Sequence, residues 1–161
     1  MPSRTPRKPE RTTAPSSRWT AVAKGTPVLA VDAVIVLENR AVVFVRRQNP
    51  PFQGCWALPG GLCEVGETVE HAVRREVDEE TGLRVEIDRL VGVFSDPHRD
   101  PRGHTVSIAF LTHVVGGQLR ACSDAAQVQV FSEPPERLAF DHRRILDVAG
   151  VFGAAGIVTD S

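Results

Sequence analysis

Residues 60–83 read GGLCEVGETVEHAVRREVDEETGL, a glycine-rich loop followed directly by a segment with helical spacing. The polar pair Glu67 and Thr68 suits the start of a helix. Gly82 suits the position just after the last turn, where a left-handed backbone is common. The stretch therefore predicts one loop and one helix, around which the flanking segments are organised.

The predicted helix carries carboxylates on its apolar side. At about 100° per residue, one side of the helix holds four apolar residues: Val69, Ala72, Val73 and Val77. Three acids near the C-terminal end fall on that same side: Glu76, Glu79 and Glu80. Mutual repulsion, desolvation and the negative end of the helix dipole all disfavour such a cluster. A divalent cation such as Mg²⁺ or Mn²⁺ would offset each of these unfavourable effects, because these ions prefer oxygen ligands.

A purely structural role for the acids is the alternative. The same residues would then form an acidic helix end held by i,i+4 ion pairs, such as Arg75 with Glu79. The acids lie on the side that faces the core rather than solvent, which favours the metal site.

The stretch also resembles a known motif, the Nudix box, G-x5-E-x7-R-E-U-x-E-E-x-G-U, in which U is aliphatic. Every specified position matches, from Gly61 through Glu67 and Arg75 to Leu83. The pattern is far more specific than a short glycine motif. The chain is therefore similar to Nudix hydrolases, which split a nucleoside diphosphate linked to another moiety with the help of a divalent metal.

The resemblance implies a role for each polar residue of the box. The metal ligands that it implies are one carbonyl and three carboxylates: Gly60, Glu76, Glu79 and Glu80. Arg75 would orient the acids, because its guanidinium can hold a carboxylate in two-pronged fashion. Glu67 would face the helix from the loop as a structural or assisting partner.

The general base is left open between the box and a later part of the chain. The family takes it from a box glutamate, here Glu79, or from an acid in a later loop. Related sequences often carry a glutamate about where Gln127 stands, and glutamine cannot accept the proton. Three acids beyond the box remain as candidates: Asp124, Glu133 and Asp141.

Length and composition fit one soluble globular domain, with 161 residues, 42% of them hydrophobic and 24% charged. The net charge of −1 favours neither nucleic acid nor an anionic membrane. No apolar run approaches the ~18 residues of a membrane span. The cysteines, Cys55, Cys63 and Cys122, form no CxxC pair, which argues against a disulfide framework and a zinc site. We therefore expect reduced thiols in a cytoplasmic protein.

The chain divides into a tail, one domain and a second tail. Residues 1–24 are rich in Pro, Ser, Thr and Arg without an apolar period, which predicts a disordered segment. The domain is expected over 25–152 and a C-terminal tail over 153–161. Strands are predicted at 27–37, 41–47, 83–94, 104–115, 118–121 and 126–131.

The order of elements predicts the fold class. A tight turn is expected at Gly116 and Gly117, with 118–121 as the return strand. A second helix is expected over 136–149, after the last strand. Strands, the box helix, further strands and a last helix predict an α/β (α+β) sandwich with a mixed sheet between helices. The Nudix resemblance implies the same architecture.

Three stretches outside the box bear on the substrate. They are Arg46–Arg47, SDPHRDPRGH at 95–104 and LAFDH at 138–142, and with Pro97 they resemble the ADP-ribose pyrophosphatase branch of the family. The side chains expected to meet phosphates and ribose are Arg46, Arg47, Arg99, Arg102, His104 and Asp141. The surfaces considered for stacking of adenine are Phe44, Phe94 and Trp56, for which a place in the core is the alternative.

The most specific function expected is Mg²⁺- or Mn²⁺-dependent hydrolysis of ADP-ribose to AMP and ribose 5-phosphate. One alternative is another nucleotide substrate, such as a nucleoside triphosphate, NADH or a dinucleoside polyphosphate. The other is a nucleotide sensor without turnover. The expected partner is a small nucleotide, with no nucleic acid or membrane, and the resemblance also implies a homodimer.

Overall fold

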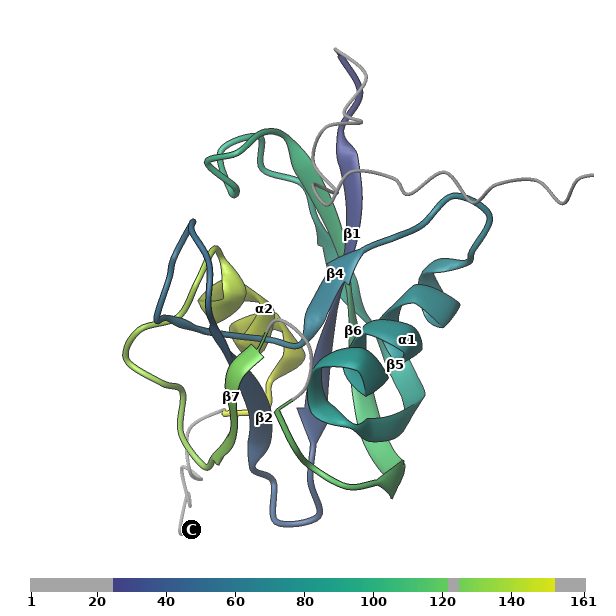
Figure 1. Cartoon of the computed structure of the whole chain (residues 1–161), viewed down its shortest axis with the longest axis vertical. Coiled ribbons are helices and arrows are strands. Elements are labelled where there is room, and N and C mark those ends of the chain that lie inside the picture. Colours follow the sequence, from purple (N-terminus) through teal and green to yellow (C-terminus); the bar gives the residue numbers. More distant parts are fainter. Residues whose placement is uncertain (1–24, 122–124, 153–161) are drawn as a thin grey trace, which may run out of the picture.

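A mixed β-sheet with one helix on each face forms the framework of the protein (Figure 1). The computed structural model describes residues 25–121 and 125–152. In chain order the elements are β1 (Val28–Val36), β2 (Val42–Arg47), β3 (Trp56–Ala57), β4 (Gly60–Leu62), α1 (Val69–Thr81), β5 (Leu83–Phe94), β6 (Thr105–Gly117), β7 (Ala125–Phe131) and α2 (His142–Ala149). The predicted α/β sandwich is confirmed. The tails predicted at 1–24 and 153–161 lie outside the described residues.

The sheet makes the loop of the box part of its own structure. Its strand order is β3-β2-β1-β6-β5, with β4 paired to β1 and β7 paired to β2. β1 and β6 run parallel, whereas the other pairs are antiparallel. β1 meets β2 at its end, where Val36 faces Val42, and meets β4 where Asp32 faces Gly60. The start of the box is therefore held by main-chain pairing to a central strand.

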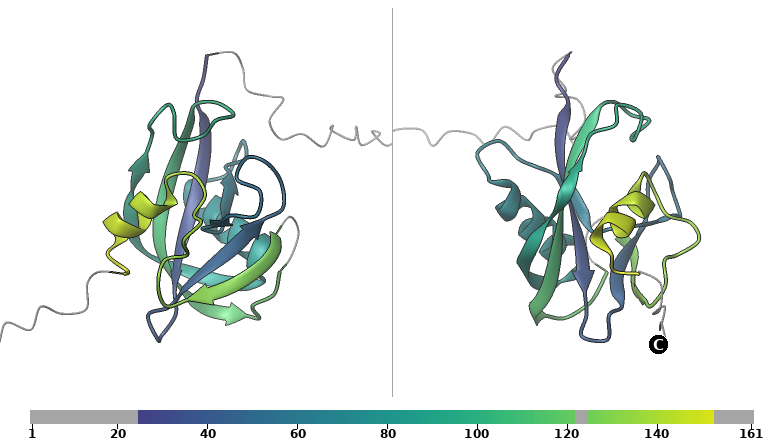
Figure 2. Two further views of the ribbon diagram at one scale, coloured as in Figure 1. Left: turned by 90° about the vertical axis from the view of Figure 1, so that its left-hand side faces the viewer. Right: turned by 180° about the vertical axis from the view of Figure 1, so that it is seen from behind.

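The two faces of the sheet bury two apolar layers. Because side chains alternate along a strand, Val31, Ala33 and Ile35 of β1 pack against α1, while Val34 packs on the other side. That second layer contains Ile145, Leu146 and Ala149 of α2. The views in Figure 2 show α1 and α2 on opposite sides of the sheet. No helix within the described residues is long and apolar enough to cross a membrane.

Helix α1 begins and ends as its sequence predicts. The Thr68 side chain accepts a hydrogen bond from the backbone N–H of His71 at 3.2 Å, which satisfies a free donor of the first turn. Gly82 follows the last turn with φ of 71°, and its N–H donates to the carbonyl of Asp78. These caps fix the length of the helix that carries the acids.

The predicted turn at Gly116 and Gly117 is wrong. Both residues belong to β6, and Gly117 pairs with Leu83 at the start of β5. A Cβ atom on Gly117 would lie 2.9 Å from Leu83 Cα, so the glycine allows the two strands to approach closely. Residues 118–121 form no strand. The strand predicted at 126–131 is confirmed as β7, but it pairs with β2.

The predicted second helix is shorter than expected and begins at His142. The preceding backbone pairs with β3 instead: Trp56 N–H donates to the Arg137 carbonyl, and Ala139 N–H donates to the Trp56 carbonyl, both at 2.8 Å. Phe140 then takes a left-handed φ of 52°, which an α-helix does not accommodate. Tertiary pairing therefore overrides the helical spacing of residues 136–141.

Candidate functional site

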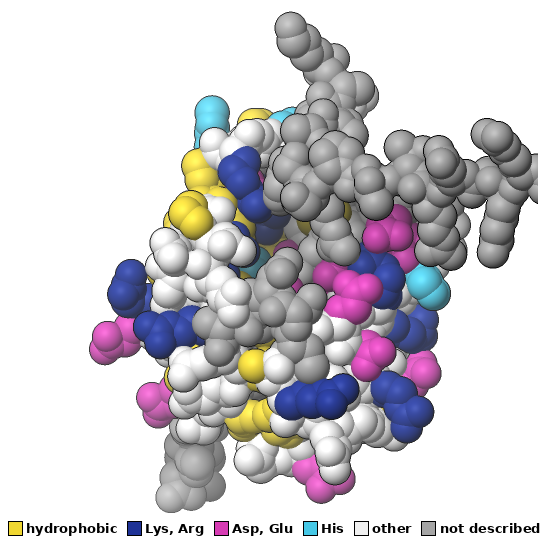
Figure 3. Space-filling view, in the orientation of Figure 1, with side chains coloured by type: hydrophobic (Ala, Val, Ile, Leu, Met, Phe, Trp, Pro, Cys, Tyr) yellow, Lys and Arg dark blue, Asp and Glu magenta, His cyan; other side chains and the backbone are white. Residues whose placement is uncertain are grey.

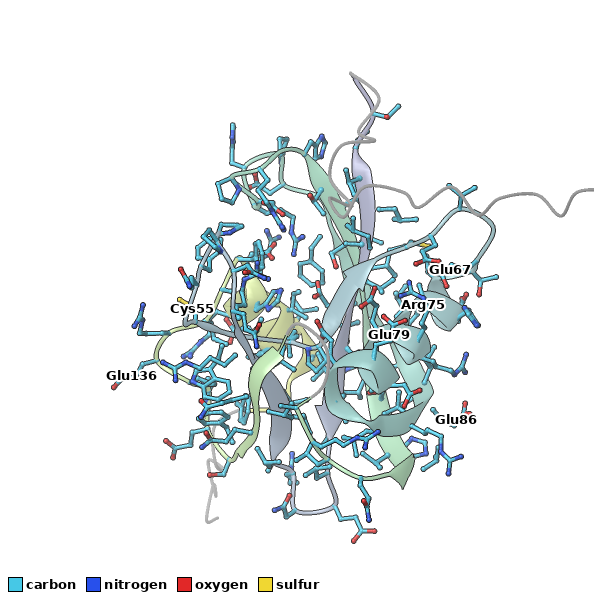
Figure 4. The ribbon with its side chains drawn as sticks, in the orientation of Figure 1. Cys55, Glu67, Arg75, Glu79, Glu86 and Glu136 are labelled. Carbon is cyan, nitrogen blue, oxygen red and sulfur yellow. The ribbon has the colours of Figure 1, made fainter. Side chains whose placement is uncertain are left out.

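Arg75, in the middle of α1, holds the polar residues of the box together (Figure 4). Its Nη2 donates to Glu67 Oε1 at 2.6 Å and its Nε donates to Glu67 Oε2 at 3.1 Å, a two-pronged ion pair. Nη1 donates to Glu76 Oε1 at 2.9 Å and to Glu79 Oε2 at 3.3 Å. Nη2 also donates to the Leu62 carbonyl of β4 at 3.0 Å. One guanidinium thus ties the loop, the strand and the helix into one unit.

The ion pair between Arg75 and Glu67 shifts the pKa values of both side chains. Hydrogen bonds from Arg75, the largest influence, lower the pKa of Glu67 to about 2. Hydrogen bonding to Glu67 in turn raises the pKa of Arg75 above its usual value. His71 adds a contact of 2.8 Å between its Nδ1 and Glu67 Oε2. Because so weak a base takes up a proton poorly near neutral pH, this geometry supports the assisting role of Glu67.

Glu76 lies buried against the glycine loop, with only 3% of its surface exposed. A Cβ atom built at Gly61 would lie 2.5 Å from Glu76 Oε1, closer than real Cβ contacts permit. The missing side chain of Gly61 is therefore what lets the carboxylate approach β4. This is the physical reason for a glycine at the first position of the box.

Glu80 is the second acid on the core side of α1. Its Oε2 accepts a hydrogen bond from the backbone N–H of Gly60 at 3.0 Å. Burial raises the pKa of Glu80 to about 8, and the negative charges of Glu76 and Asp32 raise it further. Desolvation and the neighbouring charges therefore disfavour the ionised form of Glu80, which a bound cation would stabilise.

The three box acids do not converge on one point. Glu79 bonds to Arg75 and leaves 42% of its side chain exposed, in contrast to the expectation that it shares the core side with Glu76 and Glu80. Within 25–121 and 125–152, no group of three or more His, Cys, Asp or Glu side chains is placed to hold an ion. The carboxylates of the buried Glu76 and the part-buried Glu80, with the loop at Gly60, nevertheless fit a hard cation, because they offer oxygen donors.

Replacing Gly61 by alanine tests this close packing. The new Cβ atom would push the flexible Glu76 side chain away, so we expect kcat to fall about 100-fold, while the melting temperature changes little. Steady-state kinetics and a thermal melt check both parts. Gly92→Ala is the matched control, since the nearest atom to its new Cβ is 3.5 Å away in Phe94. Unchanged kcat in Gly61→Ala would contradict the role given to Glu76.

A second polar cluster lies behind the box and centres on Asp32 of β1. Asp32 is 7% exposed and accepts a hydrogen bond from the Ser107 hydroxyl of β6. Its Oδ1 lies 3.4 Å from His142 Nε2, and its Oδ2 lies 3.8 Å from Arg99 Nη2. Burial lowers the pKa of His142, which favours the neutral ring, and Nδ1 accepts a hydrogen bond from Leu58 N–H. The sequence reading missed Asp32, although an acid within the apolar run of β1 was a signal.

Two of the arginines expected to bind substrate share one aromatic ring. The guanidinium carbons of Arg47 and Arg102 lie 4.9 and 5.6 Å from the centre of the Phe140 ring. Arg102 bonds to Asp100 through both carboxylate oxygens, at 3.0 and 2.8 Å. Arg47 Nε donates to the Pro51 carbonyl at 2.8 Å, a neutral acceptor. Two positive charges therefore meet beside one ring.

The other expected substrate ligands are engaged within the protein. Arg99 pairs with Asp141 at 2.5 Å and leaves only 4% of its side chain exposed. Arg46 is exposed and bonds to Gln127 Oε1 at 3.2 Å. His104 Nε2 lies 3.1 Å from the Ser95 carbonyl. Substrate binding by these residues stays a prediction, and Arg99 and Asp141 form a part-buried ion pair in the structure.

The aromatic surfaces considered from sequence belong to the core. Phe44 and Phe94 are 0% and 6% exposed, and Trp56 packs edge-on against Phe131 at 4.9 Å between ring centres. A different pair, Phe52 and Phe140, lies beside Arg47 and Arg102. The ring centres of this pair are 4.8 Å apart, and Phe52 is 37% exposed.

The aromatic pair also carries backbone strain. Phe52 and Phe140 have φ of 61° and 52°, which are unusual for bulky residues. Their packing beside the two arginines helps to hold the strained backbone in place. Backbone strain of this kind is common at functional sites. In the orientation of Figure 1, Figure 3 shows a hollowed surface with basic and acidic side chains along it.

Among the described residues considered for proton transfer beyond the box, two are bonded to arginines and one is exposed. Gln127 of β7 is exposed and bonded to Arg46, and Glu133 is exposed in the segment after β7. Asp141 is bound to Arg99. Asp124 lies outside the described residues, as does Cys122, whereas Cys55 and Cys63 are free thiols as expected.

The chain is similar to known proteins over most of its length. The model of the family described as NUDIX domain matches residues 26–148. The ADP-ribose pyrophosphatase of Methanocaldococcus jannaschii is 50% identical over 121 residues, 74% of this chain and 71% of that protein.

Solved structures with the same fold are similar over most of the chain. A bifunctional NMN adenylyltransferase/ADP ribose pyrophosphatase from Francisella tularensis gives a TM-score of 0.71 at 28% identity over 81% of this chain and 42% of that one. The same protein is also known complexed with AMP and a Mn ion. The NUDIX domain of Shewanella oneidensis NrtR, complexed with ADP ribose, gives a TM-score of 0.64 at 27% identity, over 77% and 86% of the two chains.

Proposed function

The chain belongs to the Nudix family of pyrophosphohydrolases, and from this premise we propose that it hydrolyses ADP-ribose to AMP and ribose 5-phosphate with Mg²⁺ or Mn²⁺. The observation that carries the proposal is the complete box, in which Arg75 clamps one acid and orients two others. The relative at 50% identity named ADP-ribose pyrophosphatase supports the choice of substrate. A cytoplasmic location and a homodimer stay predictions.

Glu76 and Glu80 would supply the negative charge that holds the cation. The residues that would hold the cation are Glu76, Glu80 and the Gly60 carbonyl, with Glu79 next to them on α1. When bound, the cation neutralises the pyrophosphate charge and lowers the pKa of water. Arg75 keeps Glu76 and Glu79 oriented, so that the acids need little rearrangement during the reaction.

Glu79 is our candidate for the general base. It is the exposed acid of the box, with 42% of its side chain open to solvent, whereas Glu76 is buried. An exposed carboxylate can reach a water molecule and pass the proton on to solvent.

The assignment of the base can be tested by two substitutions. Glu79→Gln should lower kcat about 100-fold or more with little change in KM, because the proton moves in the transition state. Gln127→Glu should raise kcat about 10-fold if β7 supplies a carboxylate to the same reaction. We would measure kcat for both single variants and the double variant. Rescue of Glu79→Gln by Gln127→Glu would indicate shared proton transfer, whereas full activity of Glu79→Gln would exclude Glu79 as the base.

Arg47, Arg102 and the aromatic pair are proposed to hold the nucleotide. The two guanidiniums can meet a phosphate, and the exposed ring of Phe52 offers a face to a base or a sugar. The charge of Arg47 acts on Glu80, so this surface borders the acids. A phosphate between the arginines would relieve the repulsion that lowers the pKa of Arg47, for which burial is the larger cause.

Removal of Arg102 tests this surface. Arg102→Ala should raise KM for ADP-ribose about 10-fold and change kcat little, because the contact is present before and during the reaction. Arg143→Ala is the control, since that arginine is exposed on α2 and pairs along its own helix with Asp147. Equal KM values for the two variants would contradict a substrate contact at Arg102.

The function itself is tested by product release. Purified protein with Mg²⁺ or Mn²⁺ should convert ADP-ribose to AMP and ribose 5-phosphate, followed by chromatography. A panel with NADH, a nucleoside triphosphate and a dinucleoside polyphosphate, ranked by kcat/KM, separates the substrate alternatives. No AMP from ADP-ribose would overturn the proposal, and tight binding in calorimetry without hydrolysis would indicate a ligand sensor.

A further inference from the structure

Asp32 is a buried acid whose surroundings are built to hold it in one orientation. Its neighbours come from four different segments: Ser107 of β6, His142 of α2, Arg99 of the 95–104 loop, and Gly60 of β4. A buried carboxylate loses its hydration, so its burial needs compensation from hydrogen-bond donors and opposite charge. The Ser107 hydroxyl and the Arg99 guanidinium provide both.

The cluster around Asp32 lies directly against the turn that leads into the box. Gly60 faces Asp32 in the β1–β4 pairing, and a Cβ atom on Gly60 would lie 2.9 Å from Asp32 Oδ1. The only residue that fits at position 60 is therefore one without a side chain. As a result, the position of the Asp32 carboxylate limits how far the Gly60 backbone can move.

Most of residues 56–60 form hydrogen bonds to other segments of the protein. Leu58 N–H donates to His142 Nδ1 at 2.9 Å, and the Pro59 carbonyl accepts from Ala33 N–H at 2.8 Å. Gly60 N–H donates to Glu80 Oε2 at 3.0 Å. Because Nδ1 of the neutral ring accepts from Leu58, its Nε2 carries the proton and faces Asp32. His142 thus connects the Asp32 carboxylate to the turn through one ring.

We propose that Asp32, together with Ser107 and His142, is the positioning device for the metal-binding turn, setting the place of the Gly60 carbonyl and of Glu80. The inference rests on the metal-binding role proposed above for Gly60 and Glu80. In this role Asp32 acts from behind the turn, as a positioning residue and not as a ligand of the cation or the substrate. Residues that orient metal ligands in this way commonly change metal affinity 10–100-fold when they are replaced.

The test measures binding of Mn²⁺ alone, in the absence of substrate, from the electron paramagnetic resonance signal of the free ion. We expect Asp32→Asn, Ser107→Ala and His142→Gln each to weaken Mn²⁺ binding about 10-fold. His142→Asn should retain most of the affinity, because its amide oxygen can occupy the place of Nδ1 and accept from Leu58 N–H. His142→Gln instead places its amide near the Nε2 position and leaves the Leu58 N–H unpaired.

Thr112→Val is the matched structural control. Thr112 is also a fully buried hydroxyl on β6 that bonds to β1, at 3.4 Å from the Val34 carbonyl, but it lies away from the turn. We expect it to lower the melting temperature about as much as Ser107→Ala and to leave Mn²⁺ affinity unchanged. Melting temperatures and circular dichroism of all variants identify any that fail to fold.

Three results would overturn the inference. Unchanged Mn²⁺ affinity in both Ser107→Ala and His142→Gln, with loss only in Asp32→Asn, would mean that Asp32 acts by charge alone. Equal losses in His142→Gln, His142→Asn and Thr112→Val would mean general destabilisation. Unchanged affinity in all variants would leave no role for the cluster in metal binding. If the wild-type protein binds Mn²⁺ but releases no AMP, the proposed substrate fails while this inference stands.

Discussion

Glu80→Gln is expected to lower kcat for ADP-ribose by about 10³-fold or more, because a charge is lost from the group that holds the cation. The fold should be kept, since the glutamine oxygen can still accept the hydrogen bond that Glu80 Oε2 receives from Gly60 N–H. Steady-state kinetics with Mg²⁺ and with Mn²⁺ measure the loss. Activity close to that of the wild type would mean that the cation is held elsewhere.

The same substitution should stabilise the metal-free protein in a pH-dependent way. Burial raises the pKa of Glu80 from its usual 4.5 to about 8, so between these values the folded protein holds a proton that the unfolded chain lacks. Raising the pH through this window therefore destabilises the wild type, and the full penalty is present above pH 8. The gain in melting temperature of Glu80→Gln should be absent near pH 4.5 and largest above pH 8. A melting temperature of Glu80→Gln below that of the wild type at high pH would contradict this account.

Arg75→Gln is expected to lower both activity and stability, in contrast to Glu80→Gln. Its loss removes the ion pairs that tie Glu67 and the buried Glu76 together, so the two acids can move apart. We expect kcat to fall about 10³-fold and the melting temperature to fall clearly. Arg75→Lys should recover only part of the lost kcat and melting temperature, because an ammonium group cannot make the two-pronged contact.

The neighbouring arginine provides the control for this prediction. Arg74 pairs with Glu86 at 3.0 Å, but both side chains are largely exposed, at 41% and 55%. Exposed pairs contribute little, so Arg74→Gln should leave kcat and the melting temperature nearly unchanged. Matching behaviour of Arg74→Gln and Arg75→Gln would mean that the clamp adds nothing beyond a surface ion pair.

Local sequence patterns were sufficient wherever neighbouring residues decide the outcome. The caps at Thr68 and Gly82 determine the ends of α1, and the apolar spacing determines which side of α1 is buried. The strands predicted at 27–37, 41–47 and 83–94 are present with small changes at their ends. These features depend on contacts within a few residues, which a linear pattern records.

Predictions failed where distant backbone competes for the same groups. The predicted turn at Gly116 and Gly117 is strand, because Gly117 packs closely on Leu83. The helix expected from residue 136 begins at His142, because the backbone before it bonds to Trp56. Glu79 turns to Arg75 and solvent rather than to the core, since it lies at the edge of the apolar stripe.

By itself, the sequence determined the family, the fold class and the acids of the box, because the box is a contiguous motif whose spacing places those acids on one helix. Only the tertiary structure decided which acids are buried, which arginines meet at Phe140, and that Asp32 lies behind Gly60. The parallel pairing of β1 with β6 and the packing of α2 bring Asp32, Ser107 and His142 together from positions far apart in the chain. Such contacts leave no periodic trace in the sequence, since each depends on strands and loops that meet only in the folded protein.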